Sequence, residues 1–542
     1  EEVQKEIDAG KDNAFMMRRV YHRISREAKK GTPYDTEVSS MFEGDKYYMF
    51  YYITYKDVRM VGAPPSSIGY FGGETDNWMW PQHKGDFAMY RVYCSPEGEP
   101  ASYSKENVPF EPKKHLKISL KGVEKDDFTM VMGYPYKTDR YLSSYGVKQQ
   151  MEVLDPALID VREDKLRIMK QAMEADPEIQ IQYADKYFNS SIFYKLTVGQ
   201  SKYLKQYGVL DIKRKLEDEF KAWVQKDEKR RATYGGVLDS LKVGYERTAN
   251  YQNTEKYFRE AVIEGCDLLQ FSLKGKGLET ILEKSDRVPE SRREFIKSGA
   301  RSHFKEYDAE LDKKLFASAV KTYLNNVDRK HLPESLFKTI DQFGGDYGKF
   351  ADHVYSNSIF ADSTKLYRFL ENPSMKKLHE DPGFRVISST LEIIFNLREK
   401  FDSREDFIRD YQKLFVDGLL KMQNRETMYP DANSTMRLTY GEVGGYSPRD
   451  AVDYNYFTTA EGYLAKEDPG DQEFKVKPRF KKLLQEGDFG RYADQSGRLR
   501  IDFLTDTDIT GGNSGSPVLN GKGELVGIAY DGNWESLTAD LY

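Results

Sequence analysis

The chain has 542 residues with 82 basic and 88 acidic side chains, which gives a net charge of −6. A hydrophobic fraction of 39% and an aromatic fraction of 13% exclude an intrinsically disordered protein, and this length predicts about two to four domains. We expect no membrane span, because no run of about 18 apolar residues occurs. The nearly balanced charge also excludes a dedicated nucleic-acid binder, which would carry a basic stripe.

The first part of the chain predicts one helix followed by strands and turns. Residues 1–30 are charged and free of proline, as in a helix, and the segments 49–55, 87–93, 115–120 and 127–133 are rich in aromatic and β-branched residues, as in strands. A further strand is expected at 524–530, shortly before the chain stops. Because the chain opens inside an element and ends soon after another, we expect both ends to be cut.

The middle of the chain has a helical pattern. Phe258, Ala261, Val262, Gly265 and Leu269 fall on one helical face, and 391–397 and 407–420 behave likewise. Strand signals return at 436–443 and 498–504. This order predicts an α+β fold in which residues 1–146 and 426–542 form one β domain and residues 147–425 form an inserted all-helical domain.

The most specific motif is a glycine-rich loop around two serines. It runs Thr510-Gly-Gly-Asn-Ser-Gly-Ser-Pro517, is followed by a strand, turn and strand, and resembles the nucleophile loop of chymotrypsin-like serine peptidases. In that pattern a glycine directly follows the nucleophile, so we choose Ser514, which Gly515 follows, over Ser516. Tight turning at glycine lets the backbone amides of Gly512 and Ser514 face a developing oxyanion. The alternative interpretation is an ordinary glycine-serine turn in a hairpin.

A nucleophilic serine needs a histidine base and a carboxylate that orients it. Asp86, after a glycine and before an aromatic strand, is the carboxylate candidate, although an aspartate there is usually a turn cap. Of seven histidines only His22 and His83 precede it; His22 lies in a charged helix, and His83 is too close in sequence to partner Asp86 across a barrel. We therefore expect the catalytic histidine to lie upstream of residue 1.

Two further groups of residues show a resemblance to a known family. The segments Asp76-Asn-Trp-Met-Trp-Pro81 with Gly85-Asp86, and 510–517 with Asp531-Gly-Asn-Trp-Glu535, resemble the bacterial serine dipeptidyl-peptidases 7 and 11. So do 429–441 and 444–449. The resemblance covers essentially the whole chain, with the family's N-terminal segment absent.

The resemblance implies a two-lobed chymotrypsin-like antiparallel β-barrel with a helical domain that caps the active site. It implies an exopeptidase that removes dipeptides from free peptide N-termini, in the periplasm, at the cell surface or secreted, in a Gram-negative bacterium. It carries over Ser514 as nucleophile, Asp86 as the orienting acid, and Asn77, Trp78 and Asp531 as holders of the substrate ammonium. A carboxylate and an amide oxygen suit that role, whereas the ordinary interpretations are turn residues and a core indole.

Position 532 bears on specificity. Family members that prefer acidic residues carry arginine there, whereas Gly532 leaves an open, uncharged pocket, so we expect a hydrophobic residue before the cleaved bond. Two positions depart from the family. Ile192 stands where the helical domain usually carries an asparagine that contributes to amine binding, and Tyr136 stands where a glycine is usual.

Two rival interpretations stay open, a chymotrypsin-like endopeptidase and a non-catalytic peptide-binding relative. No motif indicates a cofactor or metal. The expected partners are oligopeptides with a free N-terminus and, by resemblance, a second copy in a homodimer, with no nucleic acid and no membrane span. Cys94 and Cys266 are too few for a disulfide scaffold and fit no zinc site, and the sequence does not decide whether they are paired.

Overall fold

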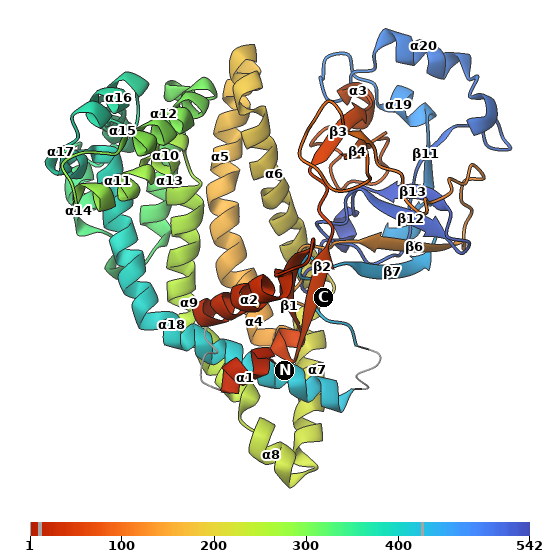
Figure 1. The fold of residues 1–542 in the computed structure, drawn as a ribbon, viewed down its shortest axis with the longest axis horizontal. Helices are drawn as coiled ribbons and strands as arrows, with labels where there is room; N and C mark the ends of the chain where they lie inside the picture. The colour runs from red at the N-terminus through yellow and green to blue at the C-terminus, as the bar shows by residue number, and fades with distance from the viewer. Residues whose placement is uncertain (1, 9–13, 424–427) are drawn as a thin grey trace. The chain divides into compact units, whose positions relative to one another are not determined.

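The computed structural model describes residues 2–8, 14–423 and 428–542. The chain divides into two compact units (Figure 1), a sheet unit of Glu1–Leu142 with Lys413–Tyr542 and a helical unit of Ser143–Gln412. The α+β class with an inserted helical domain is therefore confirmed. Our expected second boundary at 425/426 lies beyond the division at 412/413, which falls inside one continuous helix, α18 (Pro382–Met422).

The sheet unit is built from short antiparallel strands with a few helices. Its strands are β1 (Asp35–Met41), β2 (Lys46–Tyr52), β3 (Asp57–Gly62), β4 (Met89–Cys94), β5 (Val108–Pro109), β6 (Phe128–Gly133), β7 (Arg437–Glu442), β8 (Tyr446–Arg449), β9 (Val452–Tyr454), β10 (Phe457–Thr459), β11 (Arg500–Phe503), β12 (Ser516–Asn520) and β13 (Leu525–Ala529). Its helices are α1 (Glu2–Asp8), α2 (Ala14–Lys29), α3 (Ser66–Gly69), α19 (Glu461–Lys466) and α20 (Pro478–Glu486).

The central sheet joins the two halves of this unit. Its order is β13-β12-β6-β7, so β6, which precedes the helical insertion, pairs with β7 and β12, which follow it (Figure 1). A bridge between Val443 and Thr505 continues the pairing toward the β10-β11 pair, and a parallel bridge joins Ile118 to Leu525 at the other edge. Among the described residues the strands do not close into a complete ring.

One local prediction in this unit was wrong. The segment 115–120 is not a strand, because only Ile118 forms a bridge there and the flanking backbone is irregular. Of the helix predicted over 1–30, the structure describes α1 and α2, and residues 9–13 lie outside the described residues. The other predicted strands are present as β2, β4, β6, β7, β11 and β13, each within a few residues of the expected bounds.

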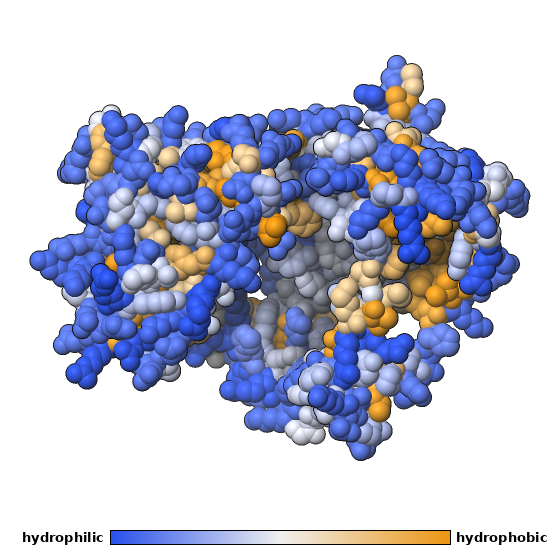
Figure 2. Space-filling view, turned by 90° about the horizontal axis from the view of Figure 1, so that it is seen from above, coloured by the Kyte–Doolittle hydropathy of each residue, from blue (hydrophilic) through white to orange (hydrophobic). Residues whose placement is uncertain are grey.

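The sheet unit exposes many large apolar side chains. Figure 2 shows hydrophobic residues gathered on the part of the surface that carries the sheets. Tyr440 of β7 is 72% exposed, and Leu438, Met60 and Tyr90 are exposed on β7, β3 and β4. The buried side chains of the central sheet, such as Val131 on β6 and Val518 on β12, lie on neighbouring paired strands.

The helical unit contains the longest helices of the structure. Its helices are α4 (Ser144–Gln149), η2 (Gln150–Leu154), α5 (Asp155–Ala175), α6 (Pro177–Gln206), α7 (Val209–Gln225), α8 (Glu228–Tyr234), α9 (Val237–Tyr257), η3 (Phe258–Ile263), α10 (Asp267–Ser272), α11 (Lys274–Leu282), α12 (Glu290–Lys305), α13 (Ala309–Asn326), η4 (Arg329–His331), α14 (Glu334–Asp341), α15 (Tyr347–Asn357), α16 (Ser363–Glu371), α17 (Met375–Glu380) and most of α18. Several begin at an aspartate cap; Asp176 accepts from the amide of Glu178, and Asp308 accepts from that of Leu311.

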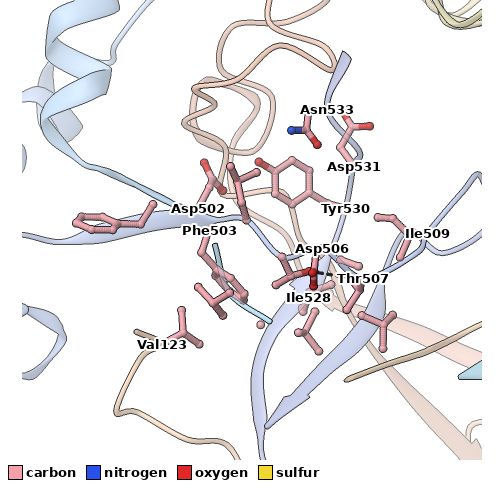
Figure 3. A pocket seen from close by; sticks show the side chains of 18 of the residues that line it. Val123, Asp502, Phe503, Asp506, Thr507, Ile509, Ile528, Tyr530, Asp531 and Asn533 are labelled. Atoms are coloured by element: carbon pink, nitrogen blue, oxygen red, sulfur yellow. Dashed lines mark hydrogen bonds between the residues drawn. The ribbon is translucent and has the colours of Figure 1, made fainter. Parts of the chain in front are cut away.

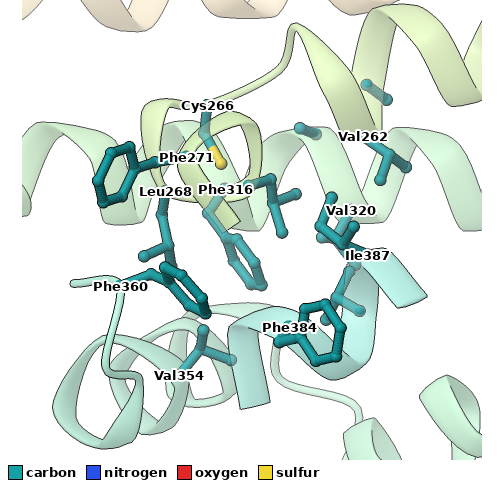
Figure 4. Close-up of a cluster of buried hydrophobic side chains, with 14 of the residues drawn as sticks. Val262, Cys266, Leu268, Phe271, Phe316, Val320, Val354, Phe360, Phe384 and Ile387 are labelled. Carbon is teal, nitrogen blue, oxygen red and sulfur yellow. The ribbon is translucent and has the colours of Figure 1, made fainter. Parts of the chain in front are cut away.

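A large apolar core holds most of these helices together. Phe316, Phe360 and Phe384 are fully buried in it, and Figure 4 shows their rings gathered with Val354 and Ile387. Each such side chain contributes about 1.5–3 kcal/mol by leaving water.

The helix predicted over 258–269 is interrupted. Residues 258–263 form the π-helical segment η3, and the next helix, α10, begins only at Asp267. At the break, a Cβ on Gly265 would lie 2.0 Å from the carbonyl oxygen of Ala261, so this position excludes any side chain. The predicted apolar residues Ala261, Val262 and Leu269 are nevertheless buried in the core.

Candidate active site

The loop that carries Ser514 is a tight turn between β11 and β12. The amide of Asn513 donates to the carbonyl of Thr510 (3.1 Å), and the amide of Gly515 donates to the carbonyl of Ala529 on β13 (2.7 Å). Asn513 is buried, and Gly515 has a positive φ of 87°. The turn therefore presents Ser514 at the surface, where its side chain is exposed.

Gly512 is required at its position. Its φ is 101°, and a Cβ there would lie 2.4 Å from the carbonyl oxygen of Tyr134. The amide of Tyr136 donates to the carbonyl of Gly511 (2.7 Å), so the backbone of this unusual tyrosine supports the loop while its side chain is exposed. In the part of the chain that the structure describes, the amides of Gly512 and Ser514 have no acceptor, so both are available to an oxyanion.

The hydroxyl of Ser514 donates to the carbonyl of Tyr530 (3.1 Å). No histidine forms a hydrogen bond with this hydroxyl among the described residues. Tyr530 directly precedes Asp531, so this bond places the predicted nucleophile beside the predicted amine-binding carboxylate. Ser514 just precedes β12 and Asp531 just follows β13, and the antiparallel pairing of these strands brings the two segments side by side.

Asp86 lies near the same tyrosine. The Tyr530 hydroxyl has a pKa well above its usual range, first because it is buried and then because the carboxylates of Asp502, Asp531 and Asp86 surround it. The carboxylate of Asp86 itself has a raised pKa, because protein atoms displace its hydration, while Lys84 opposes this shift. No hydrogen bond joins Asp86 to Ser514 or to a histidine among the described residues.

His83 is unsuited to act as the base. Its ring is buried beside Tyr463 at 6.1 Å between ring centroids, and its Nε2 lies so close to Gly462 that a Cβ there would be 1.7 Å away. Burial, assisted by the charge of Lys466, lowers the pKa of His83 to about 4. The ring therefore stays neutral near pH 7 and is enclosed, as expected of a structural histidine.

Asp531 is held by the loop that carries the other predicted amine-binding residues. The amide of Trp78 donates to Oδ2 of Asp531 (3.3 Å), although the two residues are 453 positions apart. Trp78 has a positive φ of 61°, which directs its amide at this carboxylate. Burial raises the pKa of Asp531 to about 6, whereas Lys84 and the hydrogen bonds from Trp78, Gly532 and Gln82 oppose the shift.

The remaining predicted site residues lie in the same segments. Asn77 is buried in the turn before Trp78, and Gly532 donates its amide to Oδ1 of Asp531 (2.9 Å). A Cβ on Gly532 would meet only the hydroxyl of Ser536, at 2.9 Å, so a small rotation of that serine would admit a side chain. Ile192 lies on α6 of the helical unit.

Sequence reasoning missed Asp502. This buried aspartate on β11 accepts from the amide of Lys84 (3.0 Å) and bonds the Tyr530 hydroxyl, so it ties together the loop that carries Asp86 and the strand end that carries Asp531. Burial raises its pKa to about 7. The sequence carries no signal for this role, because the alternation of β11 puts Asp502 on the same face as Arg500, where a solvent-exposed residue is expected.

A cavity of about 910 Å³ opens beside these groups. Figure 3 shows Tyr530, Asp531 and Asn533 along one strand end, and Phe503 and Ile528 form an apolar part of the cavity wall. Seven acidic and three basic residues line it, so its field favours a cation. The acidic residues are Asp86, Asp126, Glu442, Asp502, Asp506, Asp508 and Asp531, and the basic residues are Lys84, Lys125 and Arg500.

The described residues contain no group of three or more histidine, cysteine, aspartate or glutamate side chains placed to hold a metal ion. Cys94 and Cys266 are both free and buried, which answers the question of their pairing. Across the described part of the chain, no helix has both the length and the apolar character needed to cross a bilayer.

Comparison with known proteins identifies the class. Residues 1–542 match the family described as Peptidase S46. Dipeptidyl-peptidase 7 of Phocaeicola vulgatus is 40% identical over 510 residues, which cover 92% of this chain and 69% of that protein. The Asp/Glu-specific dipeptidyl-peptidase of Porphyromonas gingivalis is 36% identical over 553 residues, 99% of this chain and 76% of that protein.

Solved structures agree with these similarities. Porphyromonas endodontalis DPP11 in complex with the dipeptide Arg-Asp superposes with a TM-score of 0.89 at 32% identity, covering 99% of this chain and 78% of that chain. Its complex with Arg-Glu gives a TM-score of 0.86. The chain therefore belongs to the peptidase S46 family, and the predicted resemblance is confirmed.

Proposed function

We propose that this peptidase releases dipeptides from the free N-terminus of peptides, with a hydrophobic residue before the cleaved bond, by acyl-enzyme chemistry at Ser514. The observation that carries the proposal is the bond between the Trp78 amide and the Asp531 carboxylate, next to the residue that accepts from Ser514. This arrangement supports a carboxylate, that of Asp531, held in a fixed position near the nucleophile, where it can bind the substrate ammonium. The names of the relatives, all dipeptidyl-peptidases, support the same reaction.

The proposed chemistry follows the residues in turn. Oγ of Ser514 attacks the carbonyl carbon of the second residue while a base removes its proton, and the amides of Gly512 and Ser514 receive the negative oxygen. The base then gives the proton to the departing amine, and the dipeptidyl ester forms. Water hydrolyses that ester by the same proton transfers in reverse order, which releases the dipeptide and restores Ser514.

The amine anchor sets the dipeptide length. An ammonium group carries three N–H donors, and the Asp531 carboxylate with the side-chain oxygen of Asn77 can accept from two of them. A charge-assisted bond to a buried carboxylate is about twice as strong as a neutral one. A substrate whose chain continued past this point would lack the charge and meet the wall that Trp78 forms.

Two preferences for the residue before the cleaved bond compete. Gly532 and the excess of acidic side chains around the cavity favour an uncharged, hydrophobic residue, since a substrate carboxylate would be repelled. Several relatives are instead named Asp/Glu-specific dipeptidyl-peptidases, which favours an acidic residue. Fluorogenic dipeptidyl amides that end in Phe, Leu, Asp or Lys would rank these two candidates directly by kcat/KM.

The exopeptidase assignment is tested by blocking the amine. The full-length natural protein should cleave an unblocked Leu-Phe amide at least about 100-fold faster than its N-acetylated form, because acetylation removes the charge that Asp531 binds. Equal cleavage of the two would favour an endopeptidase. No cleavage of either, with unchanged binding, would favour a non-catalytic peptide-binding relative.

The general base belongs to the same proposal. We expect it to be a histidine outside residues 1–542, since His83 is enclosed and relatives such as that of Phocaeicola vulgatus extend beyond the matched region. A location in the periplasm, at the cell surface or outside the cell, and a homodimer, are proposed from the resemblance alone. Cell fractionation and light scattering would test them.

A further inference from the structure

The helical unit encloses a second cavity of about 640 Å³. It lies among α5, α6, the end of α9 with η3, and α10, entirely within this unit. Its volume is within the range of small-molecule sites, about 300–1,000 Å³. Its charged and polar lining residues are Arg162, Lys165, Lys186, Asn189, Ser190, Lys256, Arg259, Glu260, Glu264, Asp267 and Gln270.

The cavity has more basic than acidic side chains, five against three. The carboxylate of Glu260 accepts from two of the cations, Arg162 at 2.7 Å and Lys256 at 3.0 Å. Asp267 pairs with Lys186 at 2.6 Å. Among the described residues Lys165 and Arg259 have no carboxylate within 4.0 Å, and neither has the third carboxylate, Glu264, a cation within that distance, so the five cations exceed the three carboxylates by two.

Lys165 is the clearest case. Its ammonium donates to the backbone carbonyl of Glu264 and, among the described residues, pairs with no carboxylate within 4.0 Å. Burial, with the neighbouring Arg162, lowers the pKa of Lys165, whereas the carboxylates of Asp267 and Glu264 oppose the shift without forming an ion pair with it. An enclosed ammonium is costly without an opposite charge, and an anion in the cavity would supply one.

Ser190 supplies an independent observation. Ser190 is only 4% exposed and lines the same cavity, and its hydroxyl has no hydrogen-bond partner among the described residues. A buried hydroxyl without a partner costs about 1–3 kcal/mol, so such groups usually face a ligand or water. The helical face that carries Ser190 also presents Lys186 and Asn189 to the cavity, which adds two donors.

We propose that this cavity binds a small organic anion through a carboxylate or phosphate group, with Lys165 and Ser190 as its central contacts. Both groups offer several acceptor oxygens, which match the ammonium and hydroxyl donors that the protein leaves unused.

The test uses inorganic phosphate and citrate as probes in isothermal titration calorimetry on the full chain, at constant ionic strength set with sodium chloride. The proposal expects saturable binding of at least one probe. Binding of phosphate alone would identify a phosphate ligand, and binding of citrate alone a carboxylate ligand. Lys165→Met should weaken the affinity at least about tenfold, and Ser190→Ala about threefold.

Lys170→Met is the matched control, because Lys170 lies on the same helix, α5, but is exposed and pairs with Glu174 on the same helix. It should bind the probes as the unchanged protein does. The proposal is overturned by absence of saturable binding for both probes, or by equal affinity in Lys165→Met and Lys170→Met. Circular dichroism establishes that each variant is folded, and Ser190→Ala keeps the test decisive if Lys165→Met does not fold.

Discussion

The two units use their buried groups in different ways. The helical unit buries phenylalanines such as Phe316 and Phe384 in one apolar core, whereas the sheet unit leaves Tyr440 and Met60 exposed. In the sheet unit distant segments are joined by a small apolar cluster, in which Phe71 packs on Tyr463, and by polar contacts such as that between Trp78 and Asp531. The comparison indicates that stability is concentrated in the helical unit and chemistry in the sheet unit, so substitutions in the two should have different consequences.

The largest effect is expected at the nucleophile. In the full-length natural protein, Ser514→Ala should lower kcat by about 10,000-fold or more, because the other hydroxyls of this turn are unsuited: Ser516 is buried and Thr510 is bonded to Asp540. Thermal unfolding should hardly change, because the side chain is exposed and makes one hydrogen bond. Kinetics on a dipeptidyl amide and a melting curve would measure both.

Ser119→Ala is the matched control for this change. Ser119 lies at the opposite end of β13, where its amide donates to the carbonyl of Leu525 (2.9 Å). The kcat of the Ser119→Ala variant should equal that of the unchanged protein. If Ser514→Ala kept more than about a tenth of the activity, another residue would be the nucleophile.

In the helical unit, Phe316→Ala should lower the free energy of unfolding by about 3–5 kcal/mol, because it leaves a cavity in a fully buried core. Hydrogen exchange should accelerate in residues 143–412. Phe395→Ala, on the exposed side of α18, should change stability by less than about 1 kcal/mol. Equal acceleration in β6 and β12 would show that the two units unfold together and would break the comparison.

Within the sheet unit, Gly532→Arg should shift the preference before the cleaved bond from hydrophobic to acidic by about 100-fold in the kcat/KM ratio. An arginine there would offer a bidentate partner to a substrate carboxylate. Gly532→Gln is the control, since it adds bulk without charge and should lower all activities without favouring acidic substrates. A wild-type preference for Asp or Glu would contradict our assignment of the pocket.

The pH dependence should reveal the buried carboxylate. Asp531 must be ionised to bind an ammonium, and because its pKa is raised to about 6, its ionised fraction falls as the pH drops through that value. Affinity for a free dipeptide should therefore fall about 30-fold between pH 7.5 and pH 4.5. For the Asp531→Asn variant, calorimetry across this range should show a much flatter profile, and an equally steep one would assign the dependence to Asp502 or Asp86.

The sequence was most informative where the signal is local. The turn around Ser514 follows from glycines at 511, 512 and 515, and the central strands follow from their apolar alternation. The residues 258–269 were harder, because the pattern of apolar positions continues through a π-helical segment and a break at Gly265. Periodicity reports which side chains are buried but not whether the backbone between them is continuous.

Long-range polar contacts could not be predicted from the residues alone. The Trp78–Asp531 bond joins segments 453 positions apart, and only the resemblance to dipeptidyl-peptidases grouped these residues beforehand. Asp502 fits strand alternation as well as any polar residue would, so its bond to Tyr530 became visible only in the fold. The same holds for Lys165 and Ser190, which lie on two ordinary-looking helices.

The most direct test of the amine anchor is the affinity of Leu-Phe and N-acetyl-Leu-Phe, measured by calorimetry at pH 7.5. The account predicts that acetylation weakens binding about 30- to 100-fold in the unchanged protein and in Asp126→Asn, a cavity-lining control whose positive φ of 66° suits asparagine. In Asp531→Asn the two ligands should bind equally weakly. Equal affinity for both ligands in the unchanged protein would contradict the claim that this cavity binds a free peptide N-terminus.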